Sequence, residues 1–175
     1  MRLKDKRTIV TGGGSGFGEG IVRKFRAEGA QVLVADRDEA SAKRVAEVTG
    51  ASWVRTDVAV AADVLAMVRT AVERFGGIDI LINNAGVTHL PSLLEEVSEA
   101  DFDRIVAVNM KAIYLAMREV VPLMKANVKG PGGIRGVVLN MASTAGVSPR
   151  PRLGWYNASK GWVITATRAN AVELA

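Results

Sequence analysis

Short apolar runs alternate along the chain with longer segments in which apolar residues recur at helical spacing. Five runs have the apolar content of strands that are covered on both faces, and they lie at residues 8–12, 31–36, 52–57, 79–84 and 136–143. Helical patterns lie between and after them, at residues 18–28, 38–48, 62–75, 101–125 and 156–175. This alternation is typical of successive βα units. The sequence therefore predicts an α/β fold built on a parallel sheet.

The connecting segments refine this prediction. Pro122 lies within the helical pattern at 101–125 and removes a backbone donor, so we expect that helix to bend or end near it. The segment NVKGPGG at 127–133 predicts a loop. Because no internal repeat or low-complexity linker divides the chain, we expect a single domain over residues 1–175.

Composition limits the chemistry. The chain has 175 residues, 49% hydrophobic and 23% charged, which suits a globular domain and excludes a disordered, collagen-like or coiled-coil chain. It has no cysteine and one histidine, so we expect no metal site built from these residues and no thiol chemistry. We interpret that histidine, His89, as a surface residue rather than a second catalytic base.

Charge and hydropathy bear on partners and location. The net charge is +5, but the basic residues are scattered, and their one cluster, residues 2–7, contains no stacking aromatics. We expect no nucleic-acid partner. The N-terminus lacks the apolar core of a signal peptide, and the most apolar stretch, residues 105–124, contains three charged residues. We therefore expect a cytoplasmic protein that makes no membrane contact.

The segment TGGGSGFG, residues 11–18, follows the first strand and opens a helix, which is the context that a dinucleotide-binding loop requires. Gly12 allows a tight turn, Gly16 lets the backbone approach a pyrophosphate, and Gly18 allows close packing of helix on sheet. N–H groups at the helix start would face the phosphate charge. Ser15 and Phe17 complete the candidate loop. A glycine-rich turn without a ligand is the alternative.

The second strand favours NAD as the cofactor. Its last residue, Asp36, lies about twenty residues beyond the loop, where a carboxylate can accept hydrogen bonds from both ribose hydroxyls and would repel a 2′-phosphate. Ser15 offers no positive partner to such a phosphate. Arg37 could supply one, so NADP stays open as the alternative.

Residues with catalytic chemistry lie near the C-terminal helical pattern. YNASK places Tyr156 and Lys160 four residues apart, so both project from one helix face. A nearby cation favours the phenolate and can lower the tyrosine pKa from about 10 toward neutral pH. This spacing alone does not identify a catalytic pair, since Tyr114 and Arg118 have the same spacing. Ser143 ends the fifth strand, where its hydroxyl can hold a carbonyl oxygen or satisfy backbone groups of a turn.

Together these segments resemble the short-chain dehydrogenase/reductase family, and the resemblance spans the whole chain. It includes three further matches, which are Asp57-Val58, NNAG at 83–86 and Asn109. It implies a Rossmann-type, doubly wound parallel sheet with helices on both faces. It also implies an oxidoreductase that transfers a hydride between NAD(H) and a secondary alcohol or carbonyl substrate.

The resemblance implies a role for each matching residue. Tyr156 would be the general acid–base, Ser143 would steady the substrate oxygen, Lys160 would bind the nicotinamide ribose and lower the tyrosine pKa, and Asn109 would hold a water of the proton relay. Further cofactor contacts implied by the resemblance are Asp57 and Val58 at the adenine, and Asn84, Ala85 and Gly86 along the nucleotide. The Asn83 side chain would support the sheet.

Members of the family continue with about two more strands, so the resemblance implies a chain that lacks them at its C-terminus. It also implies a homodimer or homotetramer that pairs through the helices at 101–125 and from 156 onward. Two other functions stay open, an NADP-dependent 3-oxoacyl-thioester reductase and a non-catalytic nucleotide-binding fragment. Arg150 and Arg152, just before the last helix, are interpreted as solubilising, with contact to an anionic substrate as the alternative.

Overall fold

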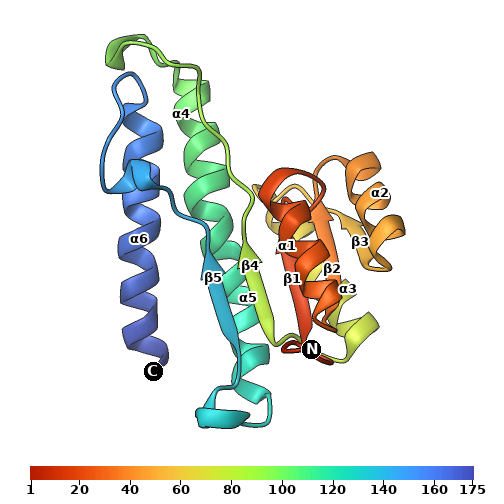
Figure 1. The fold of residues 1–175 in the computed structure, drawn as a ribbon. Helices are drawn as coiled ribbons and strands as arrows, with labels where there is room; N and C mark the ends of the chain where they lie inside the picture. Colours follow the sequence, from red (N-terminus) through yellow and green to blue (C-terminus); the bar gives the residue numbers. More distant parts are fainter.

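The chain forms one five-stranded parallel sheet with helices on both faces (Figure 1). The computed structural model describes residues 1–175. The strands are β1 (Arg7–Thr11), β2 (Gln31–Asp36), β3 (Ser52–Arg55), β4 (Ile80–Asn83) and β5 (Val137–Asn140). The helices are α1 (Gly16–Ala27), α2 (Glu39–Thr49), α3 (Ala61–Phe75), α4 (Glu99–Ile105), α5 (Ala112–Ala126) and α6 (Gly154–Leu174). A π-helical turn, Val106–Lys111, joins α4 to α5, and short 3₁₀ turns cover Leu94–Glu96, Pro131–Gly133 and Thr144–Gly146.

The strand order is β3-β2-β1-β4-β5, and all neighbouring strands run parallel. The chain moves outward from β1 to β3, returns beside β1 with β4, and then moves outward on the other side. Val10 of β1 therefore pairs with Val34 of β2 and with Ile82 of β4. This reversal confirms the doubly wound topology, which leaves a crevice outside the carboxyl ends of β1 and β4.

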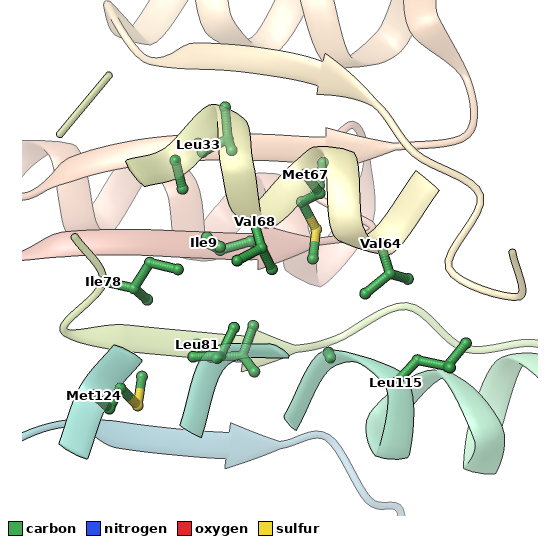
Figure 2. Packing of buried hydrophobic residues seen from close by; sticks show 13 residues of the cluster. Ile9, Leu33, Val64, Met67, Val68, Ile78, Leu81, Leu115 and Met124 are labelled. Carbon is green, nitrogen blue, oxygen red and sulfur yellow. The ribbon is translucent and has the colours of Figure 1, made fainter. Parts of the chain in front are cut away.

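Successive residues of a strand serve opposite faces of the sheet, which explains why the central strands β2, β1 and β4 are largely apolar and buried. The expectation of burial on both faces is wrong for β5, an edge strand in which Val137 and Leu139 are 48% and 43% exposed. On one face Val10 and Val34 pack with residues of α1 and α2. On the other face Ile9 and Leu81 pack with α3 and α5. Figure 2 shows this second cluster, with Met67 of α3 and side chains of α5 around the strand residues.

Two details differ from the sequence expectations. The helix does not end at Pro122 but continues to Ala126, because the buried Val120 and Met124 anchor it on either side of the proline. The irregular part of this helix is the π-helical turn instead. The fifth strand ends at Asn140 rather than at residue 143, so Ser143 lies in the turn beyond it.

An ion pair joins the amino ends of β1 and β4. The Arg7 guanidinium donates to both carboxylate oxygens of Asp79, through Nε to Oδ2 at 2.9 Å and Nη2 to Oδ1 at 2.8 Å. The Arg7 backbone N–H donates to the same Oδ2 at 2.9 Å. This pair lies at the end of the sheet opposite the candidate site.

None of the helices is long and apolar enough to cross a bilayer.

Candidate active site

The glycine-rich loop connects β1 to α1 at the carboxyl end of the sheet. Gly12 and Gly16 have φ values of +62° and +53°, a left-handed conformation that favours glycine. A Cβ on Gly18 would lie 1.9 Å from the Gly12 carbonyl oxygen, so only glycine fits there. Ser15 begins α1 without a side-chain cap, and Ser15 and Phe17 are exposed. The first-turn N–H groups of α1 are therefore open to an anion such as a pyrophosphate.

The NNAG segment holds this loop in place. The Asn84 amide donates to the carbonyl oxygens of Thr11 at 3.0 Å and Gly12 at 3.1 Å. In return, the Thr11 hydroxyl accepts from the backbone N–H groups of Asn84 and Ala85. Asn83 points elsewhere and donates to Asn140 at 2.8 Å, which ties β4 to β5. Sequence reasoning missed Thr11, whose signal was its place before the first glycine of the loop.

Two acidic residues lie at the carboxyl ends of β2 and β3, Asp36 as the last residue of β2 and Asp57 just beyond β3. Asp36 accepts the Gly14 N–H on Oδ2 at 2.9 Å and the Asp38 N–H on Oδ1 at 3.0 Å. Each oxygen keeps a lone pair that suits a ribose hydroxyl. Arg37 beside it is exposed and forms no ion pair. Asp57 uses Oδ1 to accept the Ala59 N–H at 3.0 Å, while Val58 after it is buried.

Tyr156 and Lys160 occupy consecutive turns of α6. The Lys160 Nζ lies 5.9 Å from the centroid of the Tyr156 ring and donates to the Met141 carbonyl at 2.8 Å. Lys160 is only 6% exposed, and this burial lowers the pKa of its ammonium group. A Cβ on Gly86 would lie 3.3 Å from Nζ, so the glycine of NNAG leaves room for the lysine. The structure therefore brings these three residues together.

Asn109 connects the β4 side of the site to α6. It is buried in the π-helical turn, and such turns occur frequently at functional sites. Its Oδ1 accepts the Val87 N–H at 2.8 Å, and its amide donates to the Val87 carbonyl at 2.9 Å and to the Ser159 hydroxyl at 3.0 Å. Ser159 in turn donates to the Tyr156 carbonyl at 2.7 Å. Sequence reasoning missed Ser159, although it lies inside YNASK.

Ser143 caps the 3₁₀ turn that follows β5. Its Oγ accepts the Ala145 N–H at 3.1 Å, as the turn interpretation of this serine requires. The hydroxyl hydrogen has no acceptor within the protein and stays free to donate to a ligand oxygen.

The interpretation of His89 as a surface residue is wrong. The side chain is 3% exposed, because the ring folds back onto its own loop with Nδ1 2.7 Å from the Leu90 carbonyl. Its Nε2 is buried without a partner. No group of three or more His, Asp or Glu side chains is arranged to hold a metal ion.

An open groove of about 670 Å³ runs beside the start of α6. One wall is formed by residues 92–94 and Val97, and the other by the loop 149–152. Arg150 and Arg152 line the second wall, are exposed and form no ion pair. The backbone carbonyl of Arg152 accepts the Ser92 N–H at 3.1 Å, which joins the two walls.

A doubly wound sheet with an open, glycine-rich helix start and an acidic residue at the end of β2 is typical of the class of dinucleotide-binding α/β proteins. The family model described as short chain dehydrogenase matches residues 6–175, and the chain belongs to this oxidoreductase family. Among curated relatives, 4-formylbenzenesulfonate dehydrogenase of Comamonas testosteroni is 39% identical over 180 residues, covering 100% of this chain and 69% of that protein. Galactitol 2-dehydrogenase of Agrobacterium fabrum is 37% identical, covering 99% and 66%.

Solved structures agree with this assignment. A 3-ketoacyl-(acyl-carrier-protein) reductase from Brucella melitensis, complexed with NADH, superposes with a TM-score of 0.93 at 47% identity, covering 98% of this chain and 70% of that one. A short-chain dehydrogenase/reductase from Burkholderia phymatum, in complex with NAD, gives 0.88 at 33% identity, covering 97% and 60%. The chain thus spans between 60% and 70% of the length of these four relatives.

Proposed function

We propose that the chain is the cofactor-binding and catalytic part of an NAD(H)-dependent oxidoreductase that interconverts a secondary alcohol and a carbonyl compound. The observation that carries this proposal is the buried Lys160 ammonium one helical turn from Tyr156, at the carboxyl ends of β4 and β5 and next to Gly86. A buried charge without a carboxylate partner is costly and marks a functional site. Its neighbour is the one phenol on this face of α6.

When bound, the nicotinamide ring supplies or accepts the hydride. Tyr156 donates or accepts the proton on the substrate oxygen. The Lys160 ammonium lies 5.9 Å from the centroid of the Tyr156 ring and offers donors to the nicotinamide ribose. Ser143 donates its free hydroxyl hydrogen to the same substrate oxygen. Asn109, with both amide hydrogens used, positions Tyr156 through Ser159, so a relay water would bind its backbone or its remaining Oδ1 lone pair.

Asp36 selects NAD in this proposal. A 2′-phosphate would place a second negative charge against a carboxylate that two backbone N–H groups hold in position. The exposed Arg37 keeps NADP as the alternative. The Brucella melitensis reductase, complexed with NADH, supports the reduced form of NAD and makes a 3-oxoacyl thioester the second candidate substrate. The two curated dehydrogenases support an aldehyde or a polyol instead.

The proposal is tested by titrating the purified chain with NAD and NADP and following tryptophan fluorescence. We expect tighter binding of NAD and a loss of about tenfold or more on Asp36→Ala, with NADP affected less. NADH production from galactitol and from 4-formylbenzenesulfonate, the compounds for which the two curated relatives are named, then tests turnover. Binding of neither nucleotide by the folded chain would refute the proposal, and binding without turnover would support the non-catalytic alternative.

We also propose that the protein forms a homodimer or homotetramer through α4, α5 and α6. Figure 1 shows α6 beside the continuous α4–α5 helix. These helices leave large apolar side chains exposed, namely Phe102, Tyr114, Trp155 and Trp162. Such a group of exposed aromatics is typical of an interaction surface. Light scattering that gave the mass of a monomer at micromolar concentration would contradict this assignment.

A further inference from the structure

Gly14, in the middle of the glycine-rich loop, is held on both sides by charged side chains. Its N–H donates to Asp36 Oδ2 at 2.9 Å, and its carbonyl oxygen accepts from Arg44 Nη2 at 3.0 Å. The residue is buried, and a Cβ would lie 2.9 Å both from Asp36 Oδ2 and from Ser41 Cβ. Since no side chain fits here, Gly14 cannot be fixed by its own packing. Its peptide groups are fixed instead by side chains from β2 and α2.

Arg44 is itself held by Glu19 in the first turn of α1. The guanidinium donates to Glu19 Oε2 at 2.7 Å and to Oε1 at 3.3 Å. Arg23 donates to the same carboxylate from one turn along α1, at 2.6 Å. The hydrogen bonds from Arg44 and Arg23 lower the pKa of Glu19 to about 2, so the carboxylate is ionised at physiological pH. The network connects α1, α2 and the loop, and of the two arginines only Arg44 reaches the loop.

We propose that Arg44 is a positioning residue for the coenzyme. By holding the Gly14 carbonyl, it keeps the Gly14 N–H on Asp36 and so presents the Asp36 carboxylate to the adenosine ribose. This inference rests on the proposed function, since it assigns Asp36 the ribose contact.

The physical reason is preorganisation. A carboxylate rotates freely about two side-chain bonds unless its oxygens are bound, and Asp36 has one backbone donor on each oxygen. Together the two donors leave a defined direction on each oxygen for a ribose hydroxyl. If the Gly14 peptide turns away, one donor is lost and the carboxylate must be ordered when the nucleotide binds, which weakens affinity.

Arg23 provides a matched control. It carries the same charge, binds the same Glu19 and has nearly the same side-chain exposure, 50% against 51% for Arg44. It makes no hydrogen bond to the loop. Arg44→Met and Arg23→Met each remove one positive charge near the nucleotide site while keeping an apolar stem. A difference between them reports the contact with Gly14 rather than the general loss of charge.

The first measurement needs no nucleotide. Amide hydrogen exchange of the loop, residues 11–18, is compared in the unsubstituted chain and in both variants. We expect Arg44→Met to accelerate exchange at Gly14 by about tenfold, the effect of losing one hydrogen bond to a charged group. Arg23→Met should change it by less than about twofold. Equal acceleration in both variants, or none in Arg44→Met, would overturn the inference.

The second measurement is a double-mutant cycle on the affinity for NAD and for ADP-ribose. We expect Arg44→Met to weaken both by about tenfold in the unsubstituted background and by less than about twofold in Asp36→Ala. A merely structural role would give the same loss in both backgrounds, and that result would overturn the inference. If the unsubstituted chain binds no nucleotide, the proposed function and the coenzyme role fall together, while the exchange comparison still decides whether Arg44 holds Gly14.

Discussion

Removing the Asp79 carboxylate tests how the sheet is held at the end away from the site. Asp79 accepts three hydrogen bonds from Arg7, one backbone and two from the guanidinium, at 2.8 to 2.9 Å. Both side chains are mostly buried, with 18% and 22% exposed. Breaking a fully buried pair costs about 3–5 kcal/mol, and partial solvation reduces this. We therefore expect Asp79→Ala to lower the free energy of unfolding by about 2–3 kcal/mol at pH 7.

The pH dependence of this loss follows from the Asp79 pKa. Burial raises that pKa, but the hydrogen bonds and charge of Arg7 outweigh it, so the pKa lies below its usual value of 3.8. A carboxyl with a lower pKa in the folded state stabilises the fold above its unfolded pKa, and this contribution is lost as the pH falls below about 4. The difference in the free energy of unfolding between the unsubstituted chain and Asp79→Ala should therefore become smaller as the pH falls from 7 to 3.

Urea unfolding followed by tryptophan fluorescence measures both effects. Glu119→Ala serves as the control, because Glu119 pairs with the half-exposed Arg118 on a helix surface and should contribute less than about 1 kcal/mol. If Asp79→Ala lowered the free energy of unfolding no more than Glu119→Ala does, the Arg7–Asp79 pair would not hold β1 to β4. If Asp79→Ala lowered the free energy of unfolding by the expected amount at pH 7 and by the same amount at pH 3, the ionisation of Asp79 would not be the cause of the stabilisation.

Three further predictions concern the site. Gly18→Ala should abolish NAD binding and lower the melting temperature, since the new Cβ would overlap the Gly12 carbonyl oxygen. A nucleotide titration and a thermal melt check this prediction, and retained affinity for NAD would contradict it. Tyr156→Phe should reduce kcat by about 10²–10⁴-fold with the Kd for NAD unchanged, as expected for a general acid–base; an equal loss of NAD affinity would point to a cofactor contact instead. The double substitution of Arg150 and Arg152 by Ala should raise KM for 4-formylbenzenesulfonate about tenfold and leave KM for galactitol unchanged, because only 4-formylbenzenesulfonate carries an anion. Equal changes of KM for the two compounds in steady-state kinetics would exclude the groove as an anion contact.

Local patterns predicted most of the fold because β1, β2 and β4 are largely buried and helices α1, α2, α3 and α5 each have an apolar face. β2 was predicted at its observed bounds, and the loop before α1 was recognised from short-range spacing. β5 was predicted too long, since Met141 to Ser143 continue its pattern although the strand ends at Asn140. The π-helical turn at 106–111 has no local signal in the sequence, and its Asn109 binds residues distant in the chain, Val87 and Ser159.

In the site too, the sequence predicted what depends on neighbouring residues and missed what depends on residues far apart in the chain. Tyr156 and Lys160 were found because their relation is local, four residues on one helix. The burial of His89 could not be read from its polar character, since it depends on how a whole loop folds back. Arg44 lies thirty residues from Gly14 and looks like any exposed helical arginine until the loop and α2 are placed in space.

The side chains that hold the loops of the site share one physical role, whether or not the sequence pointed to them. Asn84 binds the carbonyls of the glycine-rich loop, Asn109 binds both peptide groups of Val87, and Arg44 binds the carbonyl of Gly14. A loop that must bring its backbone close to a ligand cannot use its own side chains for packing, because they would occupy the ligand's place. Its conformation must then be fixed by side chains reaching in from other elements. For this reason, substitutions that remove such a donor while preserving size should weaken nucleotide binding more than they lower the free energy of unfolding.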